Sequence, residues 1–388
     1  MVVSMNTLVA LCAVGAEKIL GNEIKQLGYA LTGSVPGRVS FVAGDEGLYR
    51  ANLCLRTADR VYLQMASFDA GDFDALFDGA YKVDWQDFFK KDAKIVVDKV
   101  RSHGSRLASE HSVQKVVHKA IYQKLSDNWR MRVMPESGFE SDVRVYIDKD
   151  RALLLLDLSG APLHKRGYRR EGGAAPLRET VAAVLLQCMA WRRKTPLHDP
   201  FCGSGTIVCE AVLYAYNVAP GFGRRFALEN LAVFDPQAAA DIRNKEAANI
   251  RPDCVARVSG SDIDGNAAEL ARINAEHACV LAGRALQTIG SDAKIKRPEF
   301  RQADFADLKA PYEEGVLIGN PPYGERLGDE AEADALYRRM GCVFQNFPGW
   351  KSGFLTAREG FETALGRKAE SRKKITGGNL DTCFYIFV

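Results

Sequence analysis

From residue 177 onward, short apolar runs alternate with stretches of helical periodicity, and this alternation constrains the fold most strongly. Helices are predicted at 177–189, from Ile207, at 266–277 and at 332–345. Strands are predicted at 254–258, 316–318 and 352–356, with others ending near Asp199 and Asp304 and a final hairpin at 374–376 and 382–388. Strands that alternate with helices form a parallel sheet covered by helices. We therefore predict an α/β domain in this half of the chain.

One predicted strand runs directly into Asn320-Pro321-Pro322-Tyr323. Two prolines cannot continue a central strand, because they lack the N–H groups that the ladder needs. The chain must leave the sheet here in a rigid turn that presents an amide, a backbone carbonyl and an aromatic ring together. Such loops at the carboxyl ends of parallel strands often carry active sites. A purely structural turn is the alternative.

The length of 388 residues predicts two or three domains. Residues 1–66 read as β-α-β-α-β, which predicts a ferredoxin-like domain. Residues 67–165 continue in mixed α/β style, with a helix at 109–125 and a hairpin formed by 143–147 and 152–157. A segment rich in Gly, Pro and Arg at 159–176 then leads into a third domain, 166–388.

The middle of the chain is basic although the net charge is only +3. Between Lys90 and Arg170 there are 18 Lys and Arg residues against 10 Asp and Glu residues. A basic module beside a near-neutral one indicates nucleic-acid binding attached to catalysis, with a solvated surface as the alternative. Lys115, Lys119 and Lys124 share one side of the predicted helix at 109–125 and are our first candidates for RNA contact.

Several classes of function are disfavoured. No apolar run approaches the length of a membrane span and no convincing signal peptide is present, so we expect a cytoplasmic protein without a membrane partner. The nine cysteines form no C-x-x-C pair and the six histidines have no zinc spacing, so we expect no metal. The sequence does not identify protein partners.

A glycine-rich loop follows the predicted strand that ends at Asp199. It contains Gly203 and Gly205, and a helix follows it. A Gly-x-Gly between strand and helix allows the backbone to approach a ligand closely. The loop is not a Walker motif, because no Gly-Lys-Ser/Thr follows. Taken alone, this motif fits a structural turn equally well.

Two further acidic residues stand at predicted strand ends. Asp262 is suited to accept both hydroxyls of a ribose, whereas Asp264 is better explained as the N-cap of the next helix. Asp304 suits the exocyclic amine of an adenine. The distance from Gly205 to Asp262 is longer than a simple nucleotide fold needs, so 217–253 is predicted to be an insertion.

Four features together resemble the amino-methylating, Asn/Asp-Pro-Pro-Tyr group of class I S-adenosylmethionine-dependent methyltransferases. They are the loop at 199–206, Asp262, Asp304 and the segment at 320–323. The resemblance covers 176–388 and implies a Rossmann-like, seven-stranded domain that uses S-adenosylmethionine. It implies that Asn320, Pro321, Pro322 and Tyr323 are catalytic. It implies cofactor contacts from Asp199, Phe201, Gly203, Ser204, Gly205, Thr206, Asp262, Ile263, Asp304, Asn320 and Thr180.

The amino-terminal half resembles that of the THUMP-domain RNA methyltransferases. Residues 1–66 fit their ferredoxin-like domain and 67–165 their THUMP domain, followed by the basic segment His164-Lys165-Arg166-Gly167-Tyr168-Arg169. The resemblance implies RNA contacts by Lys165, Arg166, Arg169 and Arg326. It is greatest to bacterial enzymes that methylate the guanine N2 amine of large-subunit (23S) ribosomal RNA. Relatives that act on transfer RNA, and adenine-N6 methyltransferases of nucleic acids, remain alternatives.

Overall fold

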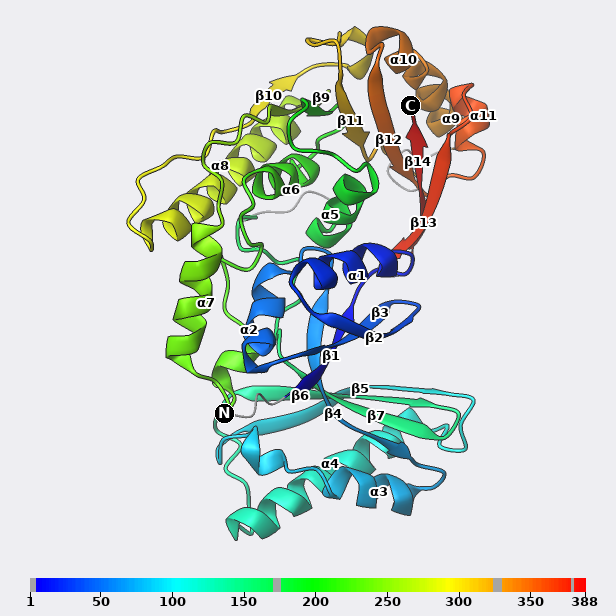
Figure 1. The fold of residues 1–388 in the computed structure, drawn as a ribbon. Helices are drawn as coiled ribbons and strands as arrows, with labels where there is room; N and C mark the ends of the chain where they lie inside the picture. The colour runs from blue at the N-terminus through cyan, green and yellow to red at the C-terminus, as the bar shows by residue number, and fades with distance from the viewer. Residues whose placement is uncertain (1–4, 170–175, 324–329, 378–379) are drawn as a thin grey trace.

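The computed structural model describes residues 5–169, 176–323, 330–377 and 380–388, and it contains two seven-stranded sheets. The first sheet is formed by the amino-terminal half and the second by the carboxy-terminal half (Figure 1). No helix in these described ranges is long and apolar enough to cross a membrane.

The amino-terminal module has the ferredoxin-like arrangement, with one strand more than the sequence pattern predicts. Its elements are β1 (Asn6–Leu11), α1 (Glu17–Gln26), β2 (Ala30–Val35), β3 (Arg38–Ala43), α2 (Asp45–Cys54) and β4 (Arg60–Asp69). The additional strand, β2, lies at the sheet edge and pairs only with β3. Because most of β2 is exposed, it lacks the apolar alternation that identifies a half-buried strand.

The second module extends the same sheet instead of forming a separate one. It consists of α3 (Phe73–Tyr81), η1 (Trp85–Asp87), β5 (Lys94–His103), α4 (Glu110–Trp129), β6 (Glu140–Asp148) and β7 (Arg151–Asp157). The predicted hairpin is confirmed as β6 and β7. Strand β4 pairs antiparallel with β7, which gives the continuous order β2-β3-β1-β4-β7-β6-β5. The first two modules therefore share one hydrogen-bonded sheet.

The carboxy-terminal sheet has the order β10-β9-β8-β11-β12-β14-β13, in which only β14 runs antiparallel to its neighbours. Its elements are α5 (Glu179–Cys188), β8 (Leu197–Asp199), α6 (Thr206–Ala215), η2 (Ala227–Asn230), α7 (Pro236–Ala248), β9 (Val258–Asp262), α8 (Gly265–Gln287), β10 (Glu299–Gln302), η3 (Phe305–Asp307), β11 (Gly315–Gly319), α9 (Glu330–Met340), α10 (Val343–Asn346), β12 (Trp350–Thr356), α11 (Phe361–Leu365), β13 (Ser371–Gly377) and β14 (Leu380–Phe387). The predicted α/β domain is thus confirmed.

Two predictions in this domain were wrong in detail. The strand predicted at 254–258 begins only at Val258 and continues to Asp262. Gly260 and Ser261 are typical of turns, but Gly260 lies within the strand, because an added Cβ would lie 2.9 Å from the Cys202 Cβ and 3.0 Å from the Phe300 ring. The helix predicted at 332–345 is divided into α9 and α10.

The predicted insertion at 217–253 joins the two halves of the molecule. Its helix α7 packs against α2 of the first module (Figure 1). Arg50 forms an ion pair with Glu246 at 2.7 Å, and the Arg243 guanidinium donates to the Tyr49 hydroxyl at 2.6 Å. At the far end of the carboxy-terminal sheet, β13 makes a bridge from Thr376 to Val14. The first module is therefore held against both the insertion and the last hairpin.

Candidate active site

The predicted glycine-rich loop links β8 to α6, and its two glycines have different roles. Gly203 has a φ of +50°, and a side chain there would meet only open space. Gly205 has a φ of +80°, and an added Cβ would lie 2.8 Å from the Ala271 Cβ of α8. Gly203 therefore opens the loop toward a ligand, whereas Gly205 permits close packing of two helices.

Asp262 ends β9 and is fixed against this loop. One carboxylate oxygen accepts from the Gly203 N–H at 2.8 Å, and the other accepts from the Asp264 N–H at 3.1 Å. Asp264 in turn caps α8 by accepting from the Asn266 N–H at 2.9 Å, as predicted. The end of β9 is thereby hydrogen-bonded to the loop that follows β8.

A cavity of about 310 Å³ lies between these strand ends. Its lining includes Asp199, Phe201, Gly203, Ser204, Thr206 and Asn320, all predicted site residues. The other wall is formed partly by Pro176 and Leu177 before α5, and the family resemblance implied that residues 176–180 help to close the cofactor pocket. The sequence pattern did not reveal the rest of this wall, which is formed by Asn266, Ala267 and Leu270 on α8. For the α8 part of the wall, the signal in the sequence is a helical start that follows an acidic strand end.

The Asp199 carboxyl makes the cavity suitable for a cation. Asp199 is buried, and one of its oxygens accepts from the Phe201 N–H at 3.0 Å. Burial, together with the nearby Asp262 charge, raises the pKa of Asp199 well above its usual value. A cationic ligand would relieve this cost. S-Adenosylmethionine carries both a sulfonium and an ammonium group, so the residues present fit it.

The Asn320-Pro321-Pro322-Tyr323 segment follows β11, beside the same cavity. The side-chain oxygen of Asn320 is buried, and among the described residues it has no hydrogen-bond partner. A buried acceptor that lacks a partner carries an energetic cost. Because Asn320 also lines the cavity, the missing donor is expected from a bound molecule.

A chain of hydrogen bonds holds this segment from behind. The Tyr337 hydroxyl on α9 donates to the Pro322 carbonyl at 3.2 Å and contacts the Thr356 hydroxyl at 3.0 Å. The Thr356 oxygen accepts from the Arg358 N–H at 3.0 Å. The Thr356 hydroxyl can therefore donate to Tyr337, and all members of the chain are satisfied. Sequence reasoning missed Tyr337, which lies one helix beyond the motif.

Five predicted cofactor residues lie outside the cavity lining: Gly205 and Asp262, described above, and Thr180, Ile263 and Asp304. The Thr180 hydroxyl donates to Asp59 of the first module at 2.7 Å. Ile263 is 66% exposed. Asp304 accepts from the Ala306 N–H and pairs with Arg339 at 2.7 Å, so both of its oxygens are engaged within the protein. In the structure Asp304 is the N-cap of η3, and its contact with an adenine stays a prediction.

The predicted RNA contacts need correction. Arg166 is buried and pairs with Glu210 at 3.3 Å, so it stabilises the fold and is not available to RNA. Arg169 pairs with Glu179 at 3.1 Å and donates to the Thr206 hydroxyl at 2.7 Å, which places it at the wall of the cavity. Sequence alone could not distinguish these arginines from exposed ones in a basic linker.

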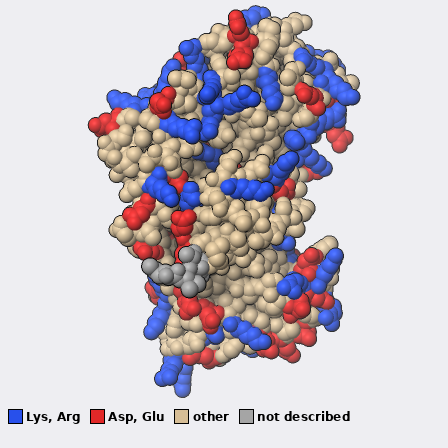
Figure 2. Space-filling view, in the orientation of Figure 1, with Lys and Arg blue, Asp and Glu red and all other residues tan. Residues whose placement is uncertain are grey.

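Of the remaining predicted RNA contacts, only three are exposed lysines within the part of the chain that the structure describes. Lys115, Lys119 and Lys165 are exposed, but Lys124 pairs with Asp84 at 3.2 Å. Arg326 lies outside the described residues. Figure 2 shows Lys and Arg side chains gathered over the catalytic half, whereas both signs of charge mix at the other end.

The fold and the site together define a class. A doubly wound sheet with one antiparallel strand, a ligand loop after β8 and an Asn-Pro-Pro-Tyr segment after β11 are the features of a class I S-adenosylmethionine-dependent methyltransferase.

Comparison with known proteins identifies the family. The RMKL-like methyltransferase domain matches residues 166–385, the RlmL ferredoxin-like domain residues 7–62, and the THUMP domain residues 70–157. "Putative RNA methyltransferase YpsC" of Bacillus subtilis (strain 168) is 39% identical over 98% of this chain and 95% of its own length. The chain therefore belongs to the RMKL-like family of S-adenosylmethionine-dependent RNA methyltransferases.

Two further relatives extend the comparison. Ribosomal RNA large subunit methyltransferase K/L of Vibrio campbellii (strain ATCC BAA-1116) is 32% identical over 97% of this chain, which spans only 52% of that protein. The crystal structure of SMU.472 in complex with SAH has a TM-score of 0.87 and 35% identity, and the match covers 99% of this chain and 98% of that one.

Proposed function

We propose that this chain transfers a methyl group from S-adenosylmethionine to the exocyclic N2 amine of a guanine in 23S ribosomal RNA. The observation that carries the proposal is the buried side-chain oxygen of Asn320, which lacks a partner at the edge of the cavity. An amine N–H is the kind of donor that this oxygen requires.

The residues of the motif suit an amine that is a poor nucleophile. The lone pair of a nucleobase amine is delocalised into the ring. Asn320 Oδ1 and the Pro321 carbonyl would each accept a hydrogen bond from one N–H of the amine. These two bonds would turn the nitrogen lone pair toward the methyl group. The prolines fix the carbonyl direction before substrate binds, which reduces reorganisation. Tyr323 would stack on a base flipped out of its helix.

We assign the cofactor contacts to the residues that line or border the cavity. Asp199 would balance the positive charge, Gly203 and Ser204 would admit the ligand to the loop, and Asp262 would accept from the ribose. Bound S-adenosylmethionine would supply an electrophilic methyl group on its sulfonium. The chain itself supplies orientation and charge balance.

The choice of substrate rests on the relatives and the amino-terminal half. Ribosomal RNA is favoured by the K/L relative, whose name contains that substrate but of which this chain spans only about half. The motif selects an amine without distinguishing guanine from adenine. Guanine N2 in transfer RNA and adenine N6 in nucleic acid are therefore the competing substrates.

One assay separates these substrates. The purified chain is incubated with methyl-labelled S-adenosylmethionine and, separately, with undermethylated ribosomal RNA, transfer RNA or DNA, and the products are digested to nucleosides and identified by mass spectrometry. We expect N2-methylguanosine from the large-subunit RNA. N6-methyladenine, or N2-methylguanosine from transfer RNA alone, would replace the proposal with one of its competitors.

A further inference from the structure

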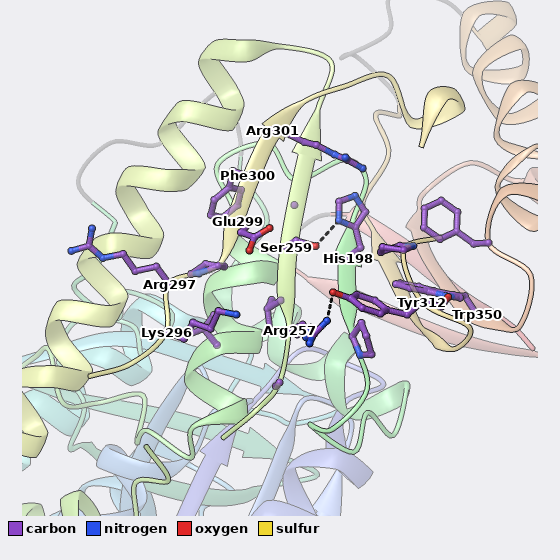
Figure 3. Close-up of a pocket in the computed structure, with 18 of the residues that line it drawn as sticks. His198, Arg257, Ser259, Lys296, Arg297, Glu299, Phe300, Arg301, Tyr312 and Trp350 are labelled. Atoms are coloured by element: carbon purple, nitrogen blue, oxygen red, sulfur yellow. Dashed lines mark hydrogen bonds between the residues drawn. The ribbon is translucent and has the colours of Figure 1, made fainter. Parts of the chain in front are cut away.

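A second cavity, of about 470 Å³, lies near the amino-terminal ends of the parallel strands of the catalytic sheet (Figure 3). The cofactor cavity is lined by residues at the carboxyl ends of strands. The second cavity is instead lined by residues at or before the starts of strands, including Pro196, Arg257, Glu299 and Trp350. It is therefore separate from the site described above.

This part of the sheet is open because the connection from β10 to β11 has almost no helix. Within that connection, 303–314, only the short turn η3 (Phe305–Asp307) is helical. Parallel sheets normally have both faces covered by helices of such crossovers. Here the strands carry polar groups on the open side. His198 of β8 bonds to the Ser259 hydroxyl at 2.9 Å, and Arg301 of β10 lies on the same side (Figure 3).

The floor of the cavity is polar but neutral. The second ring nitrogen of His198 bonds to the Ser261 hydroxyl at 3.0 Å. Burial, with a smaller effect from Arg301, lowers the pKa of His198 to about 4, so the ring is uncharged at neutral pH. The floor therefore offers hydrogen-bonding groups without adding charge.

The rim of the cavity is strongly basic. Its charged lining residues are Arg257, Lys296, Arg297, Arg301 and Lys309, against the single acid Glu299. Arg297 pairs with Glu276 at 2.9 Å. The other four basic residues have no ion pair with a carboxylate of the described chain. These four exposed side chains give the rim a net positive charge that favours an anionic partner.

An aromatic ring stands among these cations. Tyr312 is 40% exposed, and the Arg257 guanidinium lies 4.7 Å from its ring centroid and donates to its hydroxyl. Cations that neutralise phosphates, together with an exposed ring on which a base can stack, are the features of a single-stranded nucleic-acid site. An acidic protein segment would use the cations but not the ring.

We propose that this cavity is an accessory groove for a single-stranded segment of the RNA substrate. Phosphates lie against Arg257, Lys296, Arg301 and Lys309, and one base stacks on Tyr312. The inference rests on RNA as the substrate of the proposed function, but not on which base is methylated. It also accounts for basic residues on the catalytic half, where the predicted linker arginines turned out to be internal.

The groove is tested by the salt dependence of RNA binding. The probe is a fluorescein-labelled oligouridylate of about 12 nucleotides, measured by anisotropy over a series of KCl concentrations. The variant replaces Arg257, Arg301 and Lys309 by Gln. Each single-strand phosphate contact contributes about 0.7 to the slope of log K against log salt, so we expect the slope to fall by about 2. Affinity at low salt is expected to fall by roughly 10- to 100-fold.

A matched control carries the same change in charge elsewhere. It replaces Lys245, Arg251 and Arg284 by Gln; these exposed residues lie in or beside α7 and α8 and do not line the cavity. We expect a nearly unchanged slope. A third variant replaces Lys115, Lys119 and Lys124 by Gln and measures the share contributed by α4. Isothermal titration with S-adenosylhomocysteine checks that every variant retains a folded catalytic domain.

Tyr312 provides an independent arm. Tyr312→Phe keeps the ring and should bind the oligonucleotide as the wild type does, whereas Tyr312→Ala should weaken binding by roughly tenfold. In the unaltered protein, a 4-thiouridine oligonucleotide should crosslink to peptides that line the cavity.

Three results would refute the proposed RNA groove. The first is a wild-type slope of log K against log salt in the cavity variant, and the second is an equal loss of slope and affinity in the matched control. The third is binding of free GMP as tight as that of the oligonucleotide. These measurements need no methyl transfer. The groove can therefore fail while the proposed reaction holds, and the reaction can fail while the groove holds.

Discussion

At the scale of single residues, Asn320 and Asp199 are two buried polar groups at one cavity, and each needs a different kind of ligand group. The Asn320 oxygen lacks a hydrogen-bond donor, and the Asp199 carboxyl lacks a cation. Both are buried groups whose environment is unfavourable until a ligand binds. They are also the residues through which the amine substrate and the charged cofactor can be tested separately.

Asn320→Ala should remove methyl transfer while leaving cofactor binding nearly intact, because only the amine contact is lost. Loss of one preorganised polar contact in an active site costs roughly 10²- to 10³-fold in kcat. Single-turnover rates with labelled S-adenosylmethionine measure methyl transfer, and titration with S-adenosylhomocysteine measures cofactor binding. The exposed residue Asn128 supplies the control, Asn128→Ala. Near-normal turnover in Asn320→Ala would refute the assigned role.

Asp199→Asn should weaken S-adenosylmethionine binding and remove part of its pH dependence. Since burial raises the pKa of Asp199, the free protein keeps a proton there up to a higher pH than usual, and cationic ligand binding must displace that proton. Wild-type affinity should therefore rise with pH until the carboxyl is ionised in the free protein. Titration from about pH 5 to about pH 8 measures this trend. The same pH trend in Asp199→Asn would show that another group causes it.

The same substitution should stabilise the ligand-free protein. The unfolded chain ionises Asp199 near its usual pKa of about 3.9, below the raised value in the folded state. Folding stability therefore falls as the pH rises between the two values. Because Asn cannot ionise, the unfolding midpoint at neutral pH should rise by a few degrees. Asp307→Asn, an exposed change in the same domain, should have little effect on thermal unfolding.

At the scale of elements, three segments cooperate to hold the catalytic turn. The Asn-Pro-Pro-Tyr segment follows β11, but its Pro322 carbonyl is held by Tyr337 on α9, which contacts Thr356 at the end of β12. Tyr337 is fully buried and packs edge-on against Phe361 at 4.8 Å between ring centroids. The prolines restrict the turn internally, and the hydrogen-bond chain fixes where it sits.

Tyr337→Phe should reduce kcat by roughly fivefold, because loss of a net hydrogen bond of about 1 kcal/mol loosens the turn. The KM for RNA and the affinity for S-adenosylhomocysteine should change little, since neither ligand contact is removed. Steady-state kinetics separate the two parameters. Tyr214→Phe, whose ring lies against Trp191 in the same domain, is the matched control. A change confined to KM would assign Tyr337 to substrate binding instead.

At the scale of the whole molecule, the two halves are joined through buried charges. Arg166 donates to the Arg56 carbonyl and pairs with Glu210 of α6, and Arg56 itself donates to the Val218 carbonyl. The linker thereby becomes part of the core that the ferredoxin-like module and the catalytic domain share. This arrangement fixes the position of the THUMP module relative to the active site.

Glu210→Gln should strongly destabilise the protein, because it leaves Arg166 buried without a counter-charge beside Arg56. Removing one partner of a buried ion pair costs roughly 3–5 kcal/mol. Glu269→Gln breaks the exposed pair with Arg272 and should cost less than about 1 kcal/mol. Denaturant unfolding followed by circular dichroism compares the two. Equal losses would mean that the buried pair is not a special link between the halves.

The sequence by itself determined that strands alternate with helices in the carboxy-terminal half, and it located the motifs along the chain. These depend on local signals: apolar periodicity, proline and glycine chemistry, and acidic residues at strand ends. Asp199 ends a strand, and Gly203 and Asn320 lie in loops that follow strands. They were found in this way because a parallel sheet gathers such residues at the carboxyl ends of its strands.

Only the tertiary structure decided which polar residues face a ligand and which face the protein. Arg166, Asp304 and Thr180 have the same local sequence signals as functional residues, yet each is satisfied by a partner distant in sequence. Tyr337 and the second cavity had no local signal at all. Burial and hydrogen bonding depend on contacts between distant segments, and residue type alone does not encode these contacts.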